Sequence, residues 1–232
     1  MKNSKFKNWC YYLTMFGLAN GGFAQGFINL NFESARIIPL PIGQAYYYPY
    51  SVATTNALPG WTVYAGLFGS LEQQTQITVN DPATGGTWVS LLATNGSQLS
   101  GNYSVLLQGG SSAPYAAISQ TALVPVAATT LEFEAQGGQP DTLQVSLGGQ
   151  NLSLVALSAG SNYTLYGADI SAYSGQVEQL TFTSLPQGGS DGWTLDNIQF
   201  STSAVPEPGT LALAALGCLI IICYQRAARQ DT

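Results

Sequence analysis

Short runs of alternating apolar and polar residues fill the second half of the chain. In TLEFEAQ, for example, Leu131, Phe133 and Ala135 alternate with Glu132 and Glu134. The stretches DTLQVSLGG, NLSLVAL, NYTLYGADI, VEQLTFTSL and GWTLDNIQF continue the pattern. A period of two residues is typical of a strand with one face buried. The pattern therefore predicts β-strands, and no long stretch between the two ends keeps a helical period.

Clusters of turn-forming residues separate these runs at regular intervals. QGGQPD, LGGQN, SAGSN and PQGGSDG are examples, and the spacing of the breaks is about 8–12 residues. Several short strands at this spacing favour a sandwich or a barrel. NDPATGGTW and NGSQLSGNY are interpreted as hairpin turns. We expect an all-β, antiparallel β-sandwich, with Trp61, Trp88 and Trp193 in its core.

Charge is scarce and unevenly placed. Between residues 26 and 204 the chain has ten acidic residues and one basic residue, Arg36, a formal charge of −9. Phosphate backbones attract lysine and arginine, so this balance excludes nucleic acid as an expected partner. The cysteines Cys10, Cys218 and Cys223 lie near the two ends, so we expect a core without disulfides.

The residue types available exclude most catalytic designs. The chain has no histidine, and no lysine follows Lys7, so Ser-His-Asp, Cys-His and Ser-Lys arrangements are impossible in the predicted sandwich. Glu132 and Glu134 share one strand face about 7 Å apart, within reach of the spacing of inverting glycosidases. Because they alternate with apolar residues, we expect both on a solvated face. The domain is predicted not to be an enzyme.

The N-terminal sequence has the layout of a secretory signal peptide. Lysines come first, an apolar run extends from about Trp9 to Ala19, and small residues follow. The small side chains of Gly22 and Ala24 suit a signal peptidase, which predicts cleavage after Ala24. The alternative is an ordinary buried helix. A secretory signal would place the domain outside the cytoplasm.

A second apolar run lies near the C-terminus. Residues 209–224 carry no charge, and a helix of this length would span roughly 24 Å, slightly less than a hydrocarbon core. Arg226 and Arg229 follow, and the positive-inside rule places them in the cytoplasm. We expect one transmembrane helix, with a helix buried in the globule as the alternative.

The order of features at this end resembles the PEP-CTERM sorting tail, which is sometimes labelled an ice-binding protein C-terminal domain. The matching residues are a Pro-Glu-Pro motif, an apolar helix and arginines; the motif comprises Val205, Pro206, Glu207 and Pro208. The resemblance implies that an exosortase-type enzyme recognises and processes the tail. The protein is then anchored in the inner membrane before processing and reaches the cell surface or extracellular matrix afterwards. The prolines fix an extended backbone that a processing enzyme can reach.

The order of strand-like segments from FINLNFESA to GWTLDNIQFS resembles the galactose-binding-like jelly roll of many carbohydrate-binding modules. The resemblance implies that the first and last strands are neighbours and that a structural calcium lies there. Glu33 and Asp196 match its carboxylate positions. Calcium takes six to eight oxygen ligands, so other oxygens would complete the site. Asp196 has alternative roles, in capping a turn or pairing with Arg36.

The segment QAYYYPYS offers an aromatic contact surface. It contains Tyr46, Tyr47, Tyr48 and Tyr50 around a proline. Tyrosine rings stack on sugar faces and their hydroxyls hydrogen-bond to sugar oxygens. We therefore expect ligand contact here, unless the rings pack down on the end of the sandwich.

Together these features predict an exported, non-catalytic surface or matrix protein whose sandwich binds exopolysaccharide. The alternatives are a purely structural extracellular protein, and a glycosidase or lyase that uses carboxylates alone. The predicted organisation is a signal peptide (1–24), a β-sandwich (25–201), a linker with the Pro-Glu-Pro motif (202–208), a transmembrane helix (209–225) and a basic cytoplasmic tail (226–232).

Overall fold

The fold is a sandwich of two β-sheets, in agreement with the fold class predicted from the alternation. The computed structural model describes residues 25–67, 70–80, 88–94, 97–110, 115–139, 141–186 and 192–205. The predicted signal peptide with Ala24, the Pro206–Pro208 part of the motif, and the segments 209–225 and 226–232 lie outside the described residues. No helix in the described ranges is long and apolar enough to cross a membrane.

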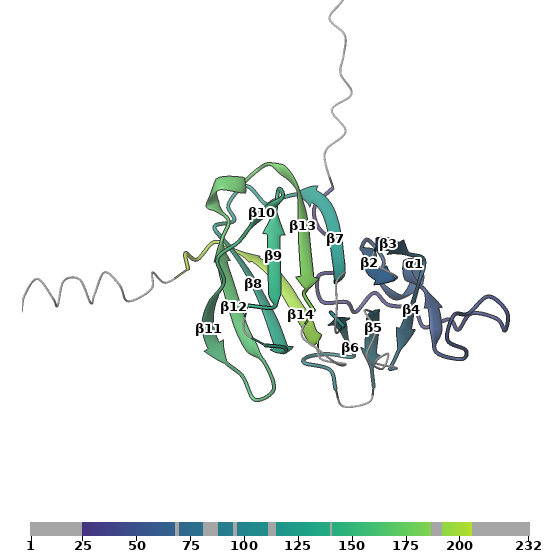
Figure 1. Cartoon of the computed structure of the whole chain (residues 1–232). Helices are drawn as coiled ribbons and strands as arrows, with labels where there is room; N and C mark the ends of the chain where they lie inside the picture. The colour runs from purple at the N-terminus through teal and green to yellow at the C-terminus, as the bar shows by residue number, and fades with distance from the viewer. Residues whose placement is uncertain are drawn as a thin grey trace, which may run out of the picture.

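One sheet has eight strands and the other has six (Figure 1). In spatial order the larger sheet contains β1 (Ser51–Ala53), β4 (Gln76–Val79), β5 (Trp88–Ala93), β6 (Tyr103–Gln108), β14 (Gly192–Ser201), β8 (Thr130–Gly137), β12 (Thr164–Asp169) and β11 (Val155–Ala159). The smaller sheet contains β10 (Gln150–Asn151), β9 (Leu143–Leu147), β13 (Val177–Ser184), β7 (Ala116–Leu123), β2 (Thr62–Leu67) and β3 (Ser70–Gln74). A short helix, α1 (Thr54–Ala57), and a 3-10 turn, η1 (Ser171–Tyr173), complete the described elements.

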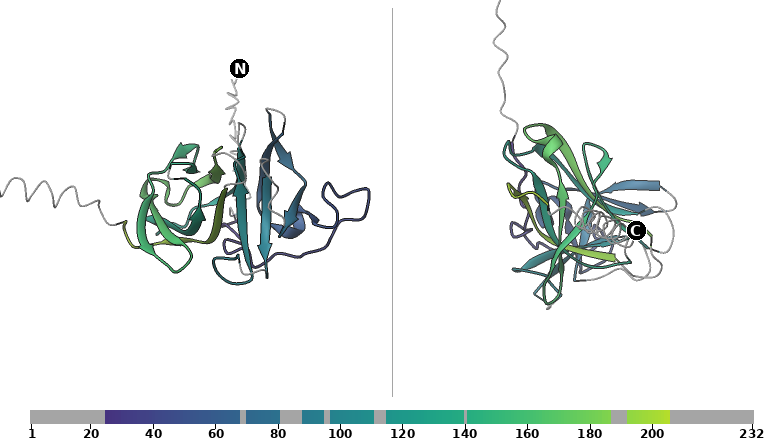
Figure 2. Two further views of the ribbon diagram at one scale, coloured as in Figure 1. Left: turned by 60° about the horizontal axis from the view of Figure 1, so that its bottom comes forward. Right: turned by 90° about the vertical axis from the view of Figure 1, so that its left-hand side faces the viewer.

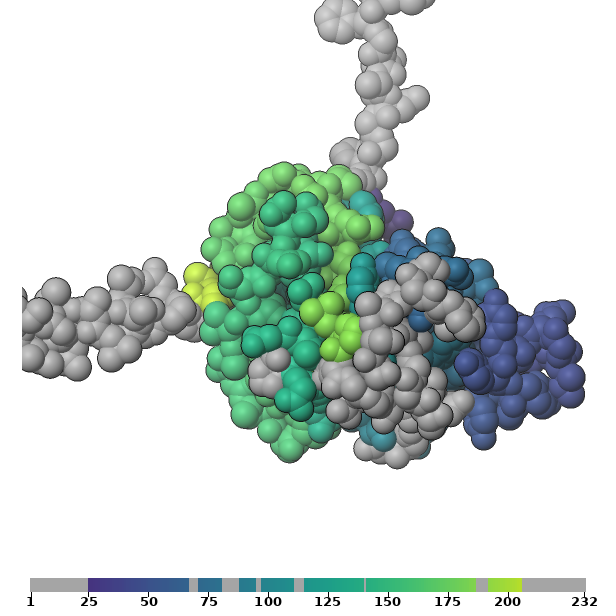
Figure 3. All heavy atoms as spheres, in the orientation of Figure 1, coloured from purple at the N-terminus to yellow at the C-terminus, as the bar shows by residue number. Residues whose placement is uncertain are grey.

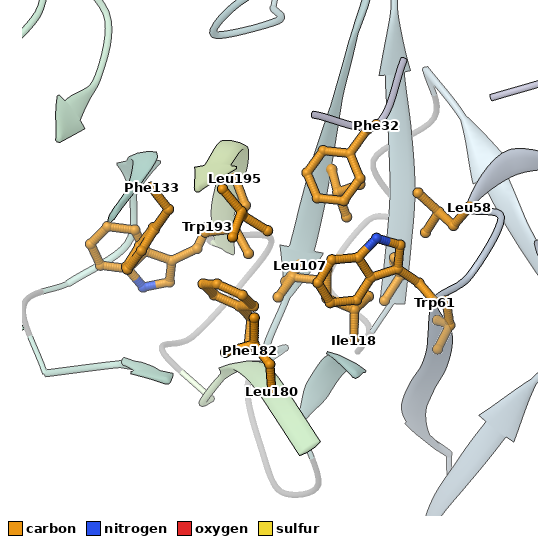
Figure 4. Close-up of a cluster of buried hydrophobic side chains, with 14 of the residues drawn as sticks. Phe32, Leu58, Trp61, Leu107, Ile118, Phe133, Leu180, Phe182, Trp193 and Leu195 are labelled. Atoms are coloured by element: carbon orange, nitrogen blue, oxygen red, sulfur yellow. The ribbon is translucent and has the colours of Figure 1, made fainter. Parts of the chain in front are cut away.

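Apolar residues from alternate positions of both sheets form the core. From the larger sheet Phe133 and Leu195 point inward, and from the smaller sheet Ile118 and Phe182 do so; all four are fully buried. The Phe182 ring meets Phe133 edge-on with centroids 5.1 Å apart. Figure 4 shows Phe182 with Phe133 and Trp193 on one side and Trp61 on the other. Trp61 and Trp193 are confirmed as core residues, at 5% and 6% exposed. Trp88 is also buried, at 3% exposed, but it alternates with the core residue Val89 and lies outside the core cluster.

Most strand pairs are antiparallel, as the alternating runs predicted. The longest ladder joins β13 to β7 over eight residue pairs, from Val177 opposite Leu123 to Ser184 opposite Ala116.

The expectation that NDPATGGTW forms a hairpin turn was wrong. Strands β4 and β5 pair in parallel, with Thr78 opposite Ser90, so NDPATGGTW does not join them as a hairpin. The turn residues in that segment indicate a break between strands but do not fix the direction of the next strand.

The N-terminal segment lies beside the last strand, as the resemblance implied, but it is not a regular strand. The Phe27 and Phe200 rings stack with centroids 5.0 Å apart, and the Ile198 amide donates to the Leu30 carbonyl at 3.0 Å. Asn29 and Phe32 have φ angles of 51° and 58°, outside the extended region of a regular β-strand. These residues turn the backbone so that Phe32 enters the core.

Candidate functional site

The outer face of the six-stranded sheet carries a trough of about 350 Å³. Strand residues that alternate with the core residues point into it, because successive side chains of a strand face opposite sides of the sheet. The lining residues are Tyr64, Leu71, Tyr115, Ala117, Ser119, Gln144, Ser146, Asn151, Gln179, Thr181 and Thr183. None of these lining residues carries a charge.

Small side chains form the floor of the trough and larger ones flank it. Ser146 on β9, Thr181 on β13 and Ser119 on β7 lie in one row across three neighbouring strands. In the next row Gln144, Thr183, Ala117 and Tyr64 follow one another from β9 to β2. Tyrosine therefore flanks one side of the small residues and amide side chains flank the other.

The chemistry of the trough suits an uncharged polar ligand. Tyrosine rings offer flat apolar faces, and their hydroxyls donate and accept hydrogen bonds. Gln144, Asn151 and Gln179 are exposed, and each amide side chain has donors and an acceptor. Sequence reasoning missed this site because its residues come from separate strands. A local signal was the outward-facing series Tyr115, Ala117 and Ser119, which begins one residue before β7.

The tyrosines predicted to contact ligand lie elsewhere, in the segment 37–50 before β1. Tyr46, Tyr47, Tyr48 and Tyr50 are all exposed, with exposed fractions of 45–62%. Tyr47 still meets the buried Trp88 edge-on, with centroids 5.2 Å apart. Gln76 on β4 holds the backbone, because its side chain accepts from the Tyr46 amide and donates to the Gln44 carbonyl, at 2.9 and 2.8 Å. In Figure 3 this segment stands out as the blue-violet lobe on the right.

The carboxylates predicted to bind calcium both contact the turn between β5 and β6. Glu33 accepts from the Asn102 backbone amide at 2.7 Å, the Asn102 side-chain amide at 2.8 Å and the Tyr103 amide at 3.1 Å. Burial acts to raise the pKa of Glu33, but these hydrogen bonds together hold it below its usual value. A Cβ on Gly101, whose φ is +55°, would lie 2.3 Å from Glu33 Oε1, so the close approach requires glycine.

Asp196 forms hydrogen bonds with the same turn and with the start of β6. Its Oδ2 accepts from the Ser104 hydroxyl at 2.7 Å and the Ser100 amide at 3.2 Å, and its Oδ1 accepts from the Asn197 amide at 2.7 Å. Burial, the largest effect, raises the pKa of Asp196 to about 6 despite these hydrogen bonds, and the nearby Glu134 carboxylate adds to the rise. The described residues contain no group of three or more His, Cys, Asp or Glu that would hold a metal ion. The calcium prediction for Glu33 and Asp196 stays a prediction.

The expectation that Glu134 is solvated was wrong. Glu132 is half-buried and Glu134 is only 9% exposed, although both point away from the core. The turn from residue 97 to residue 103 folds over this part of the sheet, and its Leu99 is 7% exposed. Alternation predicts which side of a sheet a residue faces, but it does not predict what covers that side.

Comparison with known proteins identifies one segment of the chain. Residues 204–229 match the family described as the PEP-CTERM protein-sorting motif. No curated protein and no solved structure matched the chain. The sorting-tail prediction is therefore confirmed, and it supports a protein sorted to the cell surface or the extracellular space. The match covers the end of the chain and says nothing about what the sandwich binds.

Proposed function

We propose that the chain is an exported surface or matrix protein whose β-sandwich binds a neutral polysaccharide without cleaving it. The observation that carries the proposal is the trough on the six-stranded sheet, with tyrosine on one side, amides on the other and small side chains between. A sugar ring presents a flat C–H face and a rim of hydroxyls. The trough offers partners for both, since Tyr64 and Tyr115 supply ring faces and Gln144 and Gln179 supply hydrogen bonds.

Charge favours a neutral polymer over an acidic one. The trough lining carries no charge, and the region from residue 26 to residue 204 has a formal charge of −9. A polymer rich in carboxylate or sulfate groups would be repelled by this field, whereas an uncharged polymer would not. The same field argues against nucleic acid, as the composition predicted.

The position of the sorting tail is compatible with binding at the cell surface. The described chain leaves the sandwich at Val205, on the side opposite the exposed segment 37–50 (Figure 2). By resemblance, an exosortase-type enzyme processes the tail after inner-membrane anchoring. The sandwich would then be presented to the extracellular polymer.

A non-catalytic role fits the carboxylates that the structure describes. Among the described acidic residues Glu134 and Asp196 are the most buried, and the turn 97–103 contacts Asp196 through the Ser100 amide. A substrate would have to displace that turn to reach them. The trough itself contains no acid or base, so it offers binding groups but no proton donor of the glycosidase type.

Sedimentation of the 232-residue chain with insoluble neutral and acidic polysaccharides tests the proposal. We expect retention on at least one neutral polymer and none on acidic ones. Replacement of both Tyr64 and Tyr115 by alanine should weaken binding by roughly tenfold per ring removed. Tyr48→Ala is the matched control, because it removes an exposed tyrosine outside the trough.

The Tyr48→Ala control also separates binding in the trough from binding by the tyrosines of the segment 37–50. If Tyr48→Ala loses binding while the double variant keeps it, the segment 37–50 is the ligand site and the trough assignment is wrong. Absence of binding to any neutral polymer would leave a purely structural extracellular protein as the better account. Release of soluble sugar from the polymer would contradict the non-catalytic assignment.

A further inference from the structure

A pair of buried carboxylates occupies the outer face of the eight-stranded sheet. Glu134 on β8 lies directly opposite Asp196 on β14 in the antiparallel ladder. Glu134 is 9% exposed and Asp196 is 1% exposed. Side chains directly opposite one another on a sheet have Cβ atoms about 5 Å apart, so the pair brings two acidic groups together away from water.

The turn between β5 and β6 removes the pair from solvent. Its Ser100 amide donates to Asp196, and its Leu99 amide donates to the Ser104 hydroxyl at 2.9 Å. From the far side, the Asn162 side chain donates to the carbonyls of Gln98 and Leu99 at 3.2 and 3.4 Å. These hydrogen bonds fix the turn against the outer face of the sheet at Asp196 and at Asn162.

The hydrogen bonds beneath the turn leave one oxygen without a partner. Asp196 accepts three hydrogen bonds, and Glu134 Oε1 accepts from the Asn197 side chain at 3.1 Å. Glu134 Oε2 is buried and has no hydrogen-bond partner. A buried carboxyl oxygen without a partner is costly, so this oxygen points to a ligand that the described side chains do not supply.

No basic side chain supplies a positive charge to the pair within the described residues. Arg36 is the only lysine or arginine between residues 25 and 205, and its side chain is exposed. Arg36 has no hydrogen bond or ion pair with either Glu134 or Asp196 among the described contacts. Within the described residues, the side chain directly opposite Asp196 is therefore a second carboxyl group and not a basic group.

We propose that Glu134 and Asp196 bind a divalent cation of the calcium type beneath the turn 97–103, with Glu134 Oε2 as a direct ligand. Calcium is bound by oxygen atoms, and both side chains supply carboxylate oxygens. Asn197 orients Glu134: its φ of 46° lies at the irregularity in the β14–β8 ladder, and its amide holds Oε1. This site differs from a Glu33–Asp196 site in its free oxygen, because Glu134 Oε2 has no partner whereas both Glu33 oxygens accept N–H groups.

The site does not depend on the trough or on polysaccharide binding. With two carboxylates it should bind weakly, with a Kd on the order of 10⁻⁴–10⁻³ M, the range of extracellular calcium modules. The bound ion would hold the β5–β6 turn against the sheet by neutralising the two acids beneath it.

Calcium titration followed by calorimetry and by thermal unfolding tests the assignment on the 232-residue chain at pH 7.5. We expect 10 mM CaCl₂ to raise the Tm by roughly 3–6 °C relative to EDTA. Glu134→Gln should weaken calcium binding at least about tenfold and abolish the shift, while raising the Tm in EDTA because it removes one of two like charges. Glu33→Gln is the matched control and should keep the calcium-dependent shift.

Three results would overturn the proposal: no calcium binding by the unaltered chain, an undiminished shift in Glu134→Gln, or loss of the shift in Glu33→Gln alone. The first needs no variant, so a misfolded variant leaves the test intact. The last would place the ion beside Glu33.

Discussion

Both outer faces of the sandwich are formed by strands with the same alternation of residues, but one face is open to solvent and the other is partly covered by the chain. On the six-stranded sheet, the outward residues are small or uncharged and the face stays open as a trough. On the eight-stranded sheet, the outward residues include Glu134 and Asp196, and a turn of the chain closes over them. An open face has its polar groups satisfied by water or ligand, whereas a closed face must satisfy them internally.

The comparison assigns different roles to polar residues that look alike in the sequence. Thr181 in the trough is free to be replaced without disturbing a buried network. Asp196 beneath the turn has three donors that depend on it. Substitutions in the shared core, on the closed face and on the open face should therefore differ in the size of their effects.

The largest effect is expected in the shared core. Phe182 is fully buried and packs on Phe133 and Trp61, with ring centroids 5.1 and 6.3 Å apart. Phe182→Ala should lower the free energy of unfolding by about 3–5 kcal/mol, measured by chemical denaturation. Thr181→Ala, one residue earlier and facing the trough, should change it by less than about 1 kcal/mol. Equal losses of unfolding free energy in the two variants would contradict the assignment of Phe182 to the core and Thr181 to the open face.

The closed face should show a pH dependence that the open face lacks. The pKa of Asp196 is raised to about 6, so the folded chain holds its proton more tightly than the unfolded chain. This stabilisation is complete below about pH 4, the pKa of an unfolded aspartic acid, and is lost as the pH rises through about 6. In EDTA, the loss should reach at most about 3 kcal/mol.

Denaturation of the unaltered chain and of Asp196→Asn between pH 4 and 7.5 measures this contribution. Because other acids titrate in both proteins, the difference between the two curves isolates Asp196. We expect the difference to change across the range with its midpoint near pH 5. A constant difference would show that Asp196 ionises as it does in the unfolded chain.

A smaller effect of opposite sign is expected at Glu33. The pKa of Glu33 is lowered in the folded chain, so its carboxylate stabilises the fold when the pH is above the pKa that Glu33 has in the unfolded chain. This contribution is lost as the pH falls through the lowered pKa. Glu33→Gln should cost about 1 kcal/mol at pH 7, because the hydrogen bonds to Asn102 and Tyr103 lose their charge. Thermal unfolding at pH 7 and pH 3 checks this, and the cost should nearly disappear at pH 3.

The smallest effect on stability is expected in the trough. Tyr64→Ala should lower the free energy of unfolding by about 1 kcal/mol or less, because the ring lies on the outer face. Its effect should instead be seen in polysaccharide retention. A loss of several kcal/mol would indicate that the tyrosine supports the sheet rather than a ligand.

Much of the fold could be predicted from the sequence because each strand carries its own alternation. The pattern around Leu131 and Phe133 indicates a strand and its buried face from local information alone. Strand order and direction depend on which segments meet in space, so the parallel pairing of β4 and β5 could not be read from the turn residues between them. The turns at Asn29 and Phe32 were missed because only the positive φ angles reveal them.

The functional regions were less predictable for the same reason. The sorting tail was recognisable because its features are consecutive. The trough is lined by residues of β2, β3, β7, β9, β10 and β13. Each strand contributes one to three of them, too few to form a recognisable sequence motif. The buried pair joins residues 134 and 196, and its burial depends on a turn near residue 100. Pairing and covering are tertiary properties, so no single stretch of sequence contains them.

The most direct test of the open face is a calorimetric titration with two soluble polymers of one backbone, one neutral and one carboxylated, using a neutral polymer that the chain retains. The account predicts a saturable heat with the neutral polymer that is lost when Tyr64 and Tyr115 are replaced by alanine, and no heat with the carboxylated polymer. Tighter binding of the carboxylated polymer, or undiminished binding by the double variant, would contradict it.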